Sequence, residues 1–425
     1  MKLLVKNIGL LVSARRTPRR EALRGGEMRQ LPVLRDAWLL AADGRVRDFG
    51  SMAQCPPERE ADSTVDAGGG ALFPTFCDSH THIVYADSRE GEFVDKIRGL
   101  SYAEIARRGG GILNSADRLH KLSEDELFRQ ASGRVEEVIS KGTGAIEIKS
   151  GYGLNTEDEL KMLRVIRRIR TSYPGLCVRS TFLGAHAVGR AFQGRQAEYV
   201  DYLIRETIPA VGREQLADFI DVFCDEGFFT PGETDRLLKA GREYGMMPKI
   251  HGQELADSGG VEVAVRNEAL SVDHLESMTD ADIDMLAEAP GTIPTALPGT
   301  SFFLNMPYAP ARRMIERGLA VAVASDYNPG STPSGDMKFA LSLACIKMRL
   351  LPAEALNAAT LNSAAAMGIA ADYGTLDVGK VASFFLTPPI PSADFLPYAY
   401  TTPLVKRVFL RGLPHPCPGG GCGCP

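Results

Sequence analysis

The stretch FCDSHTHIVYADSR, residues 76–89, places two histidines one residue apart in an otherwise apolar run. Side chains of a β-strand alternate between its two faces, so His80 and His82 point to the same side, together with Asp78. Two imidazoles on one side can bind one metal ion, because neutral imidazole suits zinc, iron and copper. A pair of edge histidines without a task is the alternative, and other ligands must come from the rest of the chain.

The run that carries these histidines is the first of a series in the middle of the chain. Helical stretches such as 157–170 and 352–367 separate the runs, with apolar residues at three- and four-residue spacing. Alternating strands and helices are typical of a parallel sheet, and eight such units predict a closed (β/α)8 TIM barrel in the α/β class. The runs are LFPTFCDSH (72–80), TGAIEIKS (143–150), CVRSTFLGAH (177–186), DFIDVFCDE (218–226), MPKIH (247–251), LSVDH (270–274), GTIPTAL (291–297) and LAVAVASD (319–326).

Both ends of the chain carry a β-rich pattern instead. Alternating runs cover 2–12 and 37–50, the second with a hairpin-type turn at Asp43 and Gly44. Three strand-like runs, GTLDVGK, VASFFLT and VKRVFLRG, follow the last helix, so we expect one small discontinuous β-sandwich around the barrel. The expected boundaries are 1–70 and 369–412 for the two parts of the sandwich, 71–368 for the barrel and 413–425 for a disordered Pro/Gly/Cys tail.

Composition narrows the class of protein. The chain has 425 residues, 44% of them hydrophobic, and a net charge of −5 with dispersed basic residues, which argues against a nucleic-acid surface. No apolar run approaches the length of a membrane span, and the first residues reach Lys6 and Asn7 too soon for a signal peptide. The cysteines form no disulfide framework. We therefore expect a soluble, cytoplasmic protein without a membrane or nucleic-acid partner, and a homodimer.

Histidines gather at the predicted C-terminal ends of the barrel strands, where the chemistry of such barrels lies. Only His120, in a helical stretch, and His415, near the C-terminus, lie elsewhere. This placement makes chance a poor explanation for the first pair. The residues at these strand ends are His80, His82, His186, His251, His274 and Asp326.

Three imidazoles and one carboxylate would hold one divalent ion and leave a position for water. Zinc and iron are the leading candidates. A bound ion lowers the pKa of its water to roughly 7 and polarises a carbonyl, so the pattern indicates metal-assisted hydrolysis. A purely structural metal is the alternative. The expected ligands are His80, His82, His251 and Asp326.

Two further residues are candidates for proton transfer. Glu254 lies three residues after His251, within reach of the metal site, and is expected to act as general acid/base. A glutamate in the first turn of a helix, favoured by the helix dipole, is the alternative. His274 is expected to orient the water or to hydrogen-bond Asp326, and the alternative is a satisfied core histidine.

Several loop residues suggest an anionic substrate. Arg89 follows the first strand, and a guanidinium is the natural bidentate partner of a carboxylate. Tyr152 lies between glycines in the second loop, and the segment 328–331 can offer backbone N–H groups and a hydroxyl to an anion. A solvated surface arginine and an ordinary turn remain the alternatives.

The motifs together resemble the imidazolonepropionase family of the amidohydrolase superfamily, from about residue 64 to beyond 380. They are HTH, DSREGEF, RRGGGI, EIKSGYGL, STFLGAHAV, FCDEG, HGQE, VDHLE and SDYNPGS. The resemblance implies a distorted barrel of the amidohydrolase type, and hydrolysis of 4-imidazolone-5-propanoate to N-formimidoyl-L-glutamate, the third step of histidine degradation, with one zinc or iron ion per chain. It implies the same four ligands and these substrate contacts: Arg89, Tyr152, His186, Glu254, Asn328, Gly330 and Ser331.

The resemblance also bears on the number of metals and on rival functions. Superfamily members with two metals use a lysine at the end of strand four, where this chain has Cys224, Asp225 and Glu226, so a single metal is favoured. A related deaminase is one rival, but a neutral base needs no carboxylate clamp such as Arg89. A catalytically inactive barrel that acts as a binding protein is another, although here every expected ligand and Glu254 are present.

Overall fold

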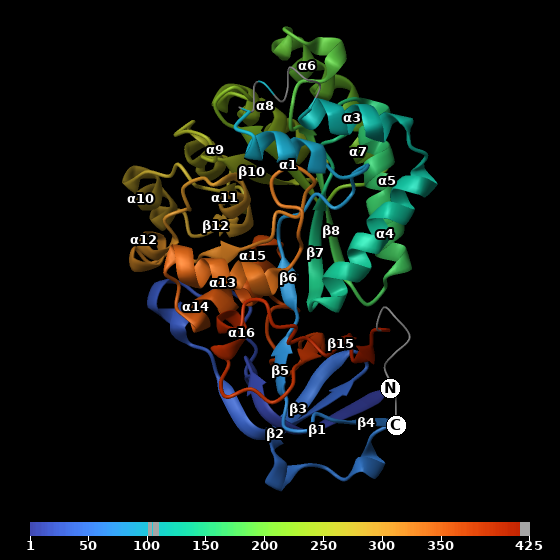
Figure 1. Ribbon diagram of the computed structural model, residues 1–425, viewed down its shortest axis with the longest axis vertical. Helices are drawn as coiled ribbons and strands as arrows, with labels where there is room; N and C mark the ends of the chain where they lie inside the picture. Colours follow the sequence, from blue (N-terminus) through green and yellow to red (C-terminus); the bar gives the residue numbers. More distant parts are fainter. Residues whose placement is uncertain (101–103, 105–109, 417–425) are drawn as a thin grey trace.

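Eight parallel strands form the central sheet of the computed structural model, which describes residues 1–100, 104 and 110–416. The strands follow one another in chain order. The two edges of the sheet meet where Thr81 pairs with Tyr327 and the His82 N–H donates to the Tyr327 carbonyl at 2.9 Å, which makes a near-barrel (Figure 1). The strands are β6 (Phe76–Asp78), β7 (Thr143–Lys149), β8 (Cys177–Ala185), β9 (Phe219–Cys224), β10 (Met247–Gly252), β11 (Ser271–His274), β12 (Ile293–Ala296) and β13 (Ala322–Val323).

Each of the eight runs coincides with one of these strands, β10 extending one residue further, to Gly252, so the predicted barrel is confirmed. The first run is nevertheless divided between two sheets. Its first part forms β5 (Ala71–Pro74) of the second sheet, and only β6 belongs to the barrel. At the junction the Thr75 N–H donates to the Ser383 carbonyl of the second sheet, and the Phe76 N–H donates to the Gly142 carbonyl beside β7. The chain therefore changes sheets within a single apolar segment.

Amphipathic helices cover the outside of the barrel. The stretch 157–170 lies in α5, where the Asn155 side chain accepts the Asp158 N–H as an N-cap and Ile166 is among the buried residues. The stretch 352–367 is helical but interrupted by one π-helical turn, 358–362, whose end lets Asn362 and Ser363 bond to carbonyls of Val321 and Val323. The helices are α1 (Glu90–Ile97), α3 (Ile112–Lys121), α4 (Glu124–Ser140), α5 (Thr156–Ser172), α6 (Gln196–Tyr202), α7 (Ile208–Arg213), α8 (Pro231–Arg242), α9 (Gly260–Arg266), α10 (Asp280–Glu288), α11 (Pro298–Leu304), α12 (Ala311–Glu316), α13 (Met337–Met348), α14 (Pro352–Asn357), α15 (Ser363–Ala366) and α16 (Phe395–Tyr398).

The two chain ends form a separate mixed sheet with its own apolar core, at the opposite end of the molecule from α1 and α3 (Figure 1). This sheet curls, because the Val46 N–H donates to the Lys380 carbonyl and so joins the β3 edge to the segment before β14. The predicted β domain is thus one curled sheet rather than two stacked sheets. Its strands are β1 (Lys2–Val12), β2 (Val33–Ala42), β3 (Arg45–Ser51), β4 (Ser63–Asp66), β5, β14 (Phe384–Leu386), β15 (Arg407–Leu410) and β16 (Leu413–Pro414).

At the chain ends, one predicted turn is present in the structure and one predicted strand is not. Asp43 and Gly44 form the predicted turn between β2 and β3, with φ of 52° and 75°. The strand predicted over 374–380 is wrong, because this segment forms turns whose Leu376 N–H donates to the Ser13 carbonyl. The tail residues 417–425 and the first half of RRGGGI lie outside the described residues.

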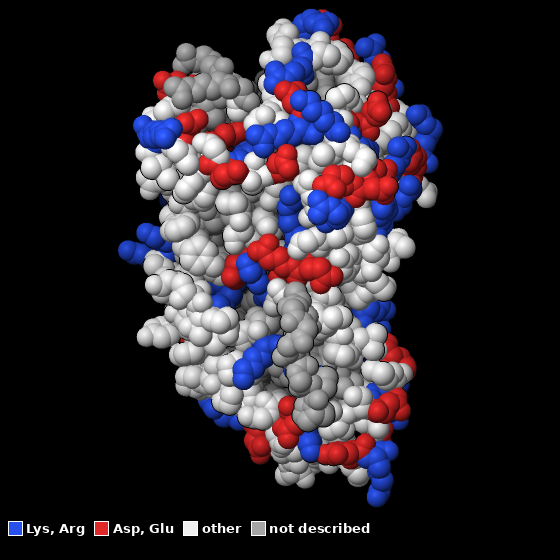
Figure 2. Space-filling model, turned by 45° about the vertical axis from the view of Figure 1, so that its right-hand side comes forward, with Lys and Arg blue, Asp and Glu red and all other residues white. Residues whose placement is uncertain are grey.

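Surface charge is mixed in sign. On the face shown in Figure 2, basic and acidic side chains lie interspersed over the barrel end. Ion pairs such as Arg190–Asp117 at 2.6 Å are half exposed, and such pairs contribute about 0–1 kcal/mol each. Among the described residues, no helix is both long enough and apolar enough to cross a membrane.

Candidate active site

Three buried histidines converge at the C-terminal end of the barrel strands. The Nε2 atom of His82 lies 3.2 Å from that of His80 and 3.4 Å from that of His251. The ligand nitrogens of all three lie within 4.8 Å of one another, a spacing that suits a shared metal ion. Burial, together with nearby cationic groups, lowers the pKa of His80 and His82 well below the usual range, so both rings are neutral and keep a lone pair for an ion.

Carboxylates behind two of the rings set their orientation. Asp273 Oδ2 lies 2.7 Å from His80 Nδ1, and Asp221 Oδ2 lies 2.9 Å from His251 Nδ1. A carboxylate can only accept, so Nδ1 of His80 carries the proton and its Nε2 keeps the lone pair, directed into the cluster. The nearby Asp221 carboxylate favours the same tautomer in His251. The donor chemistry of the residues present therefore fits a metal ion.

Asp326 faces the same cluster from the end of the eighth strand. Its Oδ1 atom lies 3.6 Å from Nε2 of both His80 and His82, while its Oδ2 accepts a 2.6 Å hydrogen bond from Thr300. The backbone of Asp326 has φ of 55°, a left-handed conformation that costs a non-glycine residue on the order of 1–3 kcal/mol. Such strain persists only where the surroundings impose it, and here it turns the carboxylate toward the histidines.

Glu254 and His274 form a second pair beside the cluster. Glu254 Oε2 lies 3.6 Å from His274 Nε2. Burial raises the pKa of Glu254 to about 7, against the lowering effect of His274. Burial disfavours the cation of His274, but the carboxylates, Glu254 first, raise its pKa to about 10. Glu254 precedes α9 by six residues, so it is not the helix first-turn glutamate that the sequence left as an alternative.

Arg89 meets the loop after the eighth strand. Its Nε and Nη2 atoms donate to Glu92 Oε2 at 2.9 and 2.5 Å, and its side chain is 7% exposed, so it is not a solvated surface charge. A side-chain carbon at Gly330 would overlap the guanidinium, whose Nη1 lies nearest. Asn328 Oδ1 accepts the N–H groups of Gly330 and Ser331, both at 2.8 Å, which gives this loop one shape.

Tyr152 and His186 form a wall beside the histidine cluster. His186 Nδ1 donates to the Gly151 carbonyl at 3.0 Å, and its ring stacks on His82 with centroids 5.3 Å apart. Burial lowers the pKa of His186 to about 3, so the ring is neutral and its Nε2 is an acceptor. The Tyr152 ring lies 5.4 Å from the His186 ring.

The structure thus brings the sequence-predicted site residues together at one end of the barrel. Asn328 Nδ2 donates to the Asp326 carbonyl, and Ser331 Oγ lies 3.3 Å from Asp326 Oδ2, which ties the last loop to the cluster. His120 and His415, which the sequence left outside the site, bond to Asp158 and Glu136.

A buried network of charged side chains lies beneath the histidine cluster, and the sequence patterns described above did not predict it. Lys149 Nζ lies 2.7 Å from both Glu147 Oε1 and Asp221 Oδ2, and Lys249 Nζ contacts Glu147 and lies 3.9 Å from Asp273; all five side chains are fully buried. The signal was in the sequence, since charges two residues apart inside apolar runs of a parallel sheet must share its inner face.

Removing one cation from this network should destabilise the protein strongly. Lys149→Met leaves Glu147 and Asp221 short of their partner, so we expect a loss of about 3–5 kcal/mol in the free energy of unfolding, measured by urea denaturation. Lys141→Met is the control, since Lys141 pairs with Glu137 on the surface and should lose only about 0–1 kcal/mol. Equal small losses in both variants would contradict the network's role.

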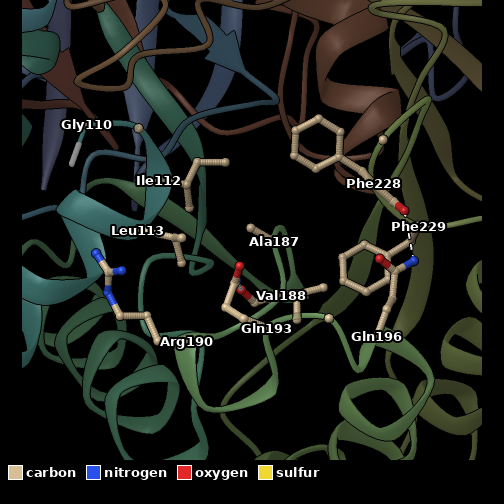
Figure 3. A pocket seen from close by; sticks show the side chains of 13 residues that line it. Gly110, Ile112, Leu113, Ala187, Val188, Arg190, Gln193, Gln196, Phe228 and Phe229 are labelled. Carbon is tan, nitrogen blue, oxygen red and sulfur yellow. Dashed lines mark hydrogen bonds between the residues drawn. The ribbon is translucent and has the colours of Figure 1, made fainter. Parts of the chain in front are cut away.

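Figure 3 shows a cavity of about 660 Å³, whose lining includes Ala187, the residue after His186. Ile112 and Leu113 line it from α3, with Val188 and Phe228 from the loops after β8 and β9. The Phe228 ring packs 4.1 Å from the ring of Phe223, and none of the expected metal ligands lines the cavity. The chemistry is therefore assigned from the histidine cluster and not from this cavity.

Comparisons with known proteins agree with the geometry. The model of the amidohydrolase family matches residues 71–412. The chain is 50% identical over 412 residues to an imidazolonepropionase from Christiangramia forsetii. The alignment covers 97% of this chain and 99% of that protein. The chain is 41% identical over 413 residues to an imidazolonepropionase from Parabacteroides distasonis, with 97% and 98% covered.

Solved structures show the same fold at low identity. A triazine hydrolase variant superposes with a TM-score of 0.75 at 16% identity, over 97% of this chain and 94% of that chain. E. coli guanine deaminase superposes with a TM-score of 0.73 at 15% identity, over 98% and 99%. At these identities the likeness concerns the fold alone.

Proposed function

The chain belongs to the amidohydrolase family and, within it, to the imidazolonepropionases, and from this premise we propose how its residues open the ring amide of 4-imidazolone-5-propanoate to give N-formimidoyl-L-glutamate. The observation that carries the proposal is the convergence of three imidazole nitrogens beside a buried glutamate of raised pKa. The test is a spectroscopic assay of purified, metal-loaded protein with the imidazolone. Absence of turnover would contradict the proposal.

We propose that His80, His82, His251 and Asp326 hold one zinc or iron ion per chain, a donor set of three nitrogens and one oxygen that suits both metals. The ion would lower the pKa of a water molecule and polarise the ring carbonyl. Asp273 and Asp221 keep His80 and His251 in the tautomer that this requires.

Glu254 is proposed to move the proton. As a carboxylate it accepts a proton from the attacking water, whose oxygen bonds to the ring carbonyl carbon. It then returns that proton to the ring nitrogen as the carbon–nitrogen bond breaks. A pKa near 7 suits both halves of this cycle. The protonated His274, 3.6 Å away, offers an N–H donor to the carbonyl oxygen or to Asp326.

The activity should therefore have an acid limb set by Glu254. The carboxylate form accepts the proton, and the pKa of Glu254 is raised to about 7, so kcat/KM should fall about tenfold per pH unit below pH 7. A cation bound nearby would favour the carboxylate form of Glu254, so it would only lower the pH at which kcat/KM begins to fall. The measurement is a pH profile of kcat/KM, and a limb well above pH 7, or one that persists in Glu254→Gln, would contradict the assignment.

Substrate choice is proposed to depend on Arg89. The ring amide is common to many cyclic substrates, so selection must come from what holds the propanoate carboxylate. Glu92 orients the guanidinium, and its Nη1 side faces Gly330 of the loop 328–331. Tyr152, His186, Asn328, Gly330 and Ser331 are proposed to contact substrate or product.

Arg89→Met should reduce kcat/KM by roughly 10- to 150-fold, since a shielded charge-assisted contact contributes on the order of 1.5–3 kcal/mol. An imidazolone without the carboxylate should be a poor substrate of the native protein and lose little further in the variant. The measurement compares both proteins with both substrates. If the two losses simply multiply, Arg89 does not bind the carboxylate.

We also propose a homodimer, the commonest assembly of soluble enzymes, and a cytoplasmic location, because the first residues do not match a signal peptide. Light scattering of the purified protein tests the first part, and a monomer at micromolar concentration would contradict it.

A further inference from the structure

A buried aspartate outside the reacting groups holds the loop that carries Glu254. Asp225, at the end of β9, is 4% exposed. Its Oδ2 atom accepts the backbone N–H groups of Glu254 at 2.8 Å and Leu255 at 2.9 Å, and its Oδ1 accepts that of Ala256 at 3.2 Å. Three consecutive backbone N–H groups of the loop after β10 therefore donate to one carboxylate.

A buried glutamate holds the loop that carries Tyr152 in the same way. Glu159, in the first turn of α5, is fully buried. Its Oε1 atom accepts the N–H groups of Gly153 at 2.8 Å and Leu154 at 2.9 Å, and its Oε2 accepts that of Gly151 at 3.1 Å. The amides on both sides of Tyr152 are thus bound to one side chain.

These contacts differ from ordinary loop packing. Loops usually run over the surface, where water satisfies much of their backbone. Hydrogen bonds to an ionised carboxylate are about twice as strong as bonds between neutral groups. Three such bonds from one loop restrict that loop to one conformation. Both loops also contain a non-glycine residue at a positive φ that its surroundings must hold, 54° at Gln253 and 54° at Leu154. The side chains that depend on them are the proposed proton carrier and a proposed substrate contact.

We propose that Asp225 and Glu159 are positioning residues, each acting through one loop. Asp225 sets the place of Glu254 beside His274 and so governs proton transfer. Glu159 sets the place of Tyr152 beside His186 and so governs substrate binding. The proposal rests on the proposed function, because it takes its two target residues from it.

The test is a pair of double-mutant cycles on the metal-loaded protein. Asp225→Asn turns part of the acceptor into a donor and should lower kcat by roughly 10- to 100-fold with KM within about threefold. Added to Glu254→Gln, it should cost less than about threefold, since no proton carrier is left to position. Added to Tyr152→Phe, it should keep its full cost, which makes this combination the matched control.

Glu159→Gln should give the opposite pattern. We expect KM to rise roughly tenfold with kcat within about threefold, and this rise should shrink in the Tyr152→Phe background but persist in the Glu254→Gln background. Metal content should stay unchanged in both single variants, because neither carboxylate contacts a proposed ligand.

The outcomes separate this proposal from the proposed function. If Asp225→Asn costs the same factor with and without Glu254, or if both variants change kcat and KM alike, the positioning roles are overturned. If Glu254→Gln retains full activity, the proposed function fails instead. Where a variant does not fold, hydrogen exchange of the native protein decides: the amides of 254–256 and of 151, 153 and 154 should exchange as slowly as strand amides, and fast exchange overturns the proposal.

Discussion

His251→Ala is expected to lose its metal and its activity together. His251 supplies one of three converging Nε2 atoms, and its Nδ1 side is held by Asp221. Without the ring, the cluster keeps only two imidazoles and the Asp326 carboxylate, too few for a site that also leaves a position for water. The loss should therefore be one of binding and not of rate alone.

Elemental analysis after dialysis measures this directly. The native protein should contain about one zinc or iron ion per chain, and the variant should contain neither. His120→Ala is the matched control, because His120 bonds to Asp158 outside the site and is 67% exposed, so both metal and activity should remain. Full metal occupancy in His251→Ala would contradict the assignment of His251 as a metal ligand. Returning zinc or iron to chelator-treated native protein identifies the metal.

Glu254→Gln is expected to keep the ion and lose at least roughly 100-fold in kcat. The amide has nearly the same shape as the carboxyl group, so the loop and the cluster are preserved, but it cannot accept or return a proton. The loss should appear in kcat and in kcat/KM equally, as for an interaction made only in the transition state.

Steady-state kinetics with metal analysis of the same sample measures this separation. Glu268→Gln is the control, an exposed glutamate just after α9 that should leave both quantities unchanged. Near-normal turnover of Glu254→Gln would leave the raised pKa of Glu254 without a catalytic role.

Much of the barrel and of the site was predictable because its signals are local. Strand alternation predicts His80 and His82 on one side, and in the structure both rings converge just beyond the end of β6. The predicted strand ends likewise bring His251 and Asp326 to one end of the barrel. The boundary between β5 and β6 was not predicted, because apolar residues continue on both sides of it, Leu72 and Phe73 before and Phe76 and Cys77 after. Only their different partners, β14 and β7, divide them.

The sequence by itself determined the fold class, the family and the residue types at the strand ends, since periodicity and motifs are properties of neighbouring residues. Only the tertiary structure decided which groups meet across the barrel. His80 contacts Asp273, 193 residues away, and Asp225 binds the loop of Glu254 across the gap between two strands. Both contacts depend on strand register and barrel closure. The pKa of Glu254 depends on the burial that closure creates, because the cost of a charge is set by everything packed around it.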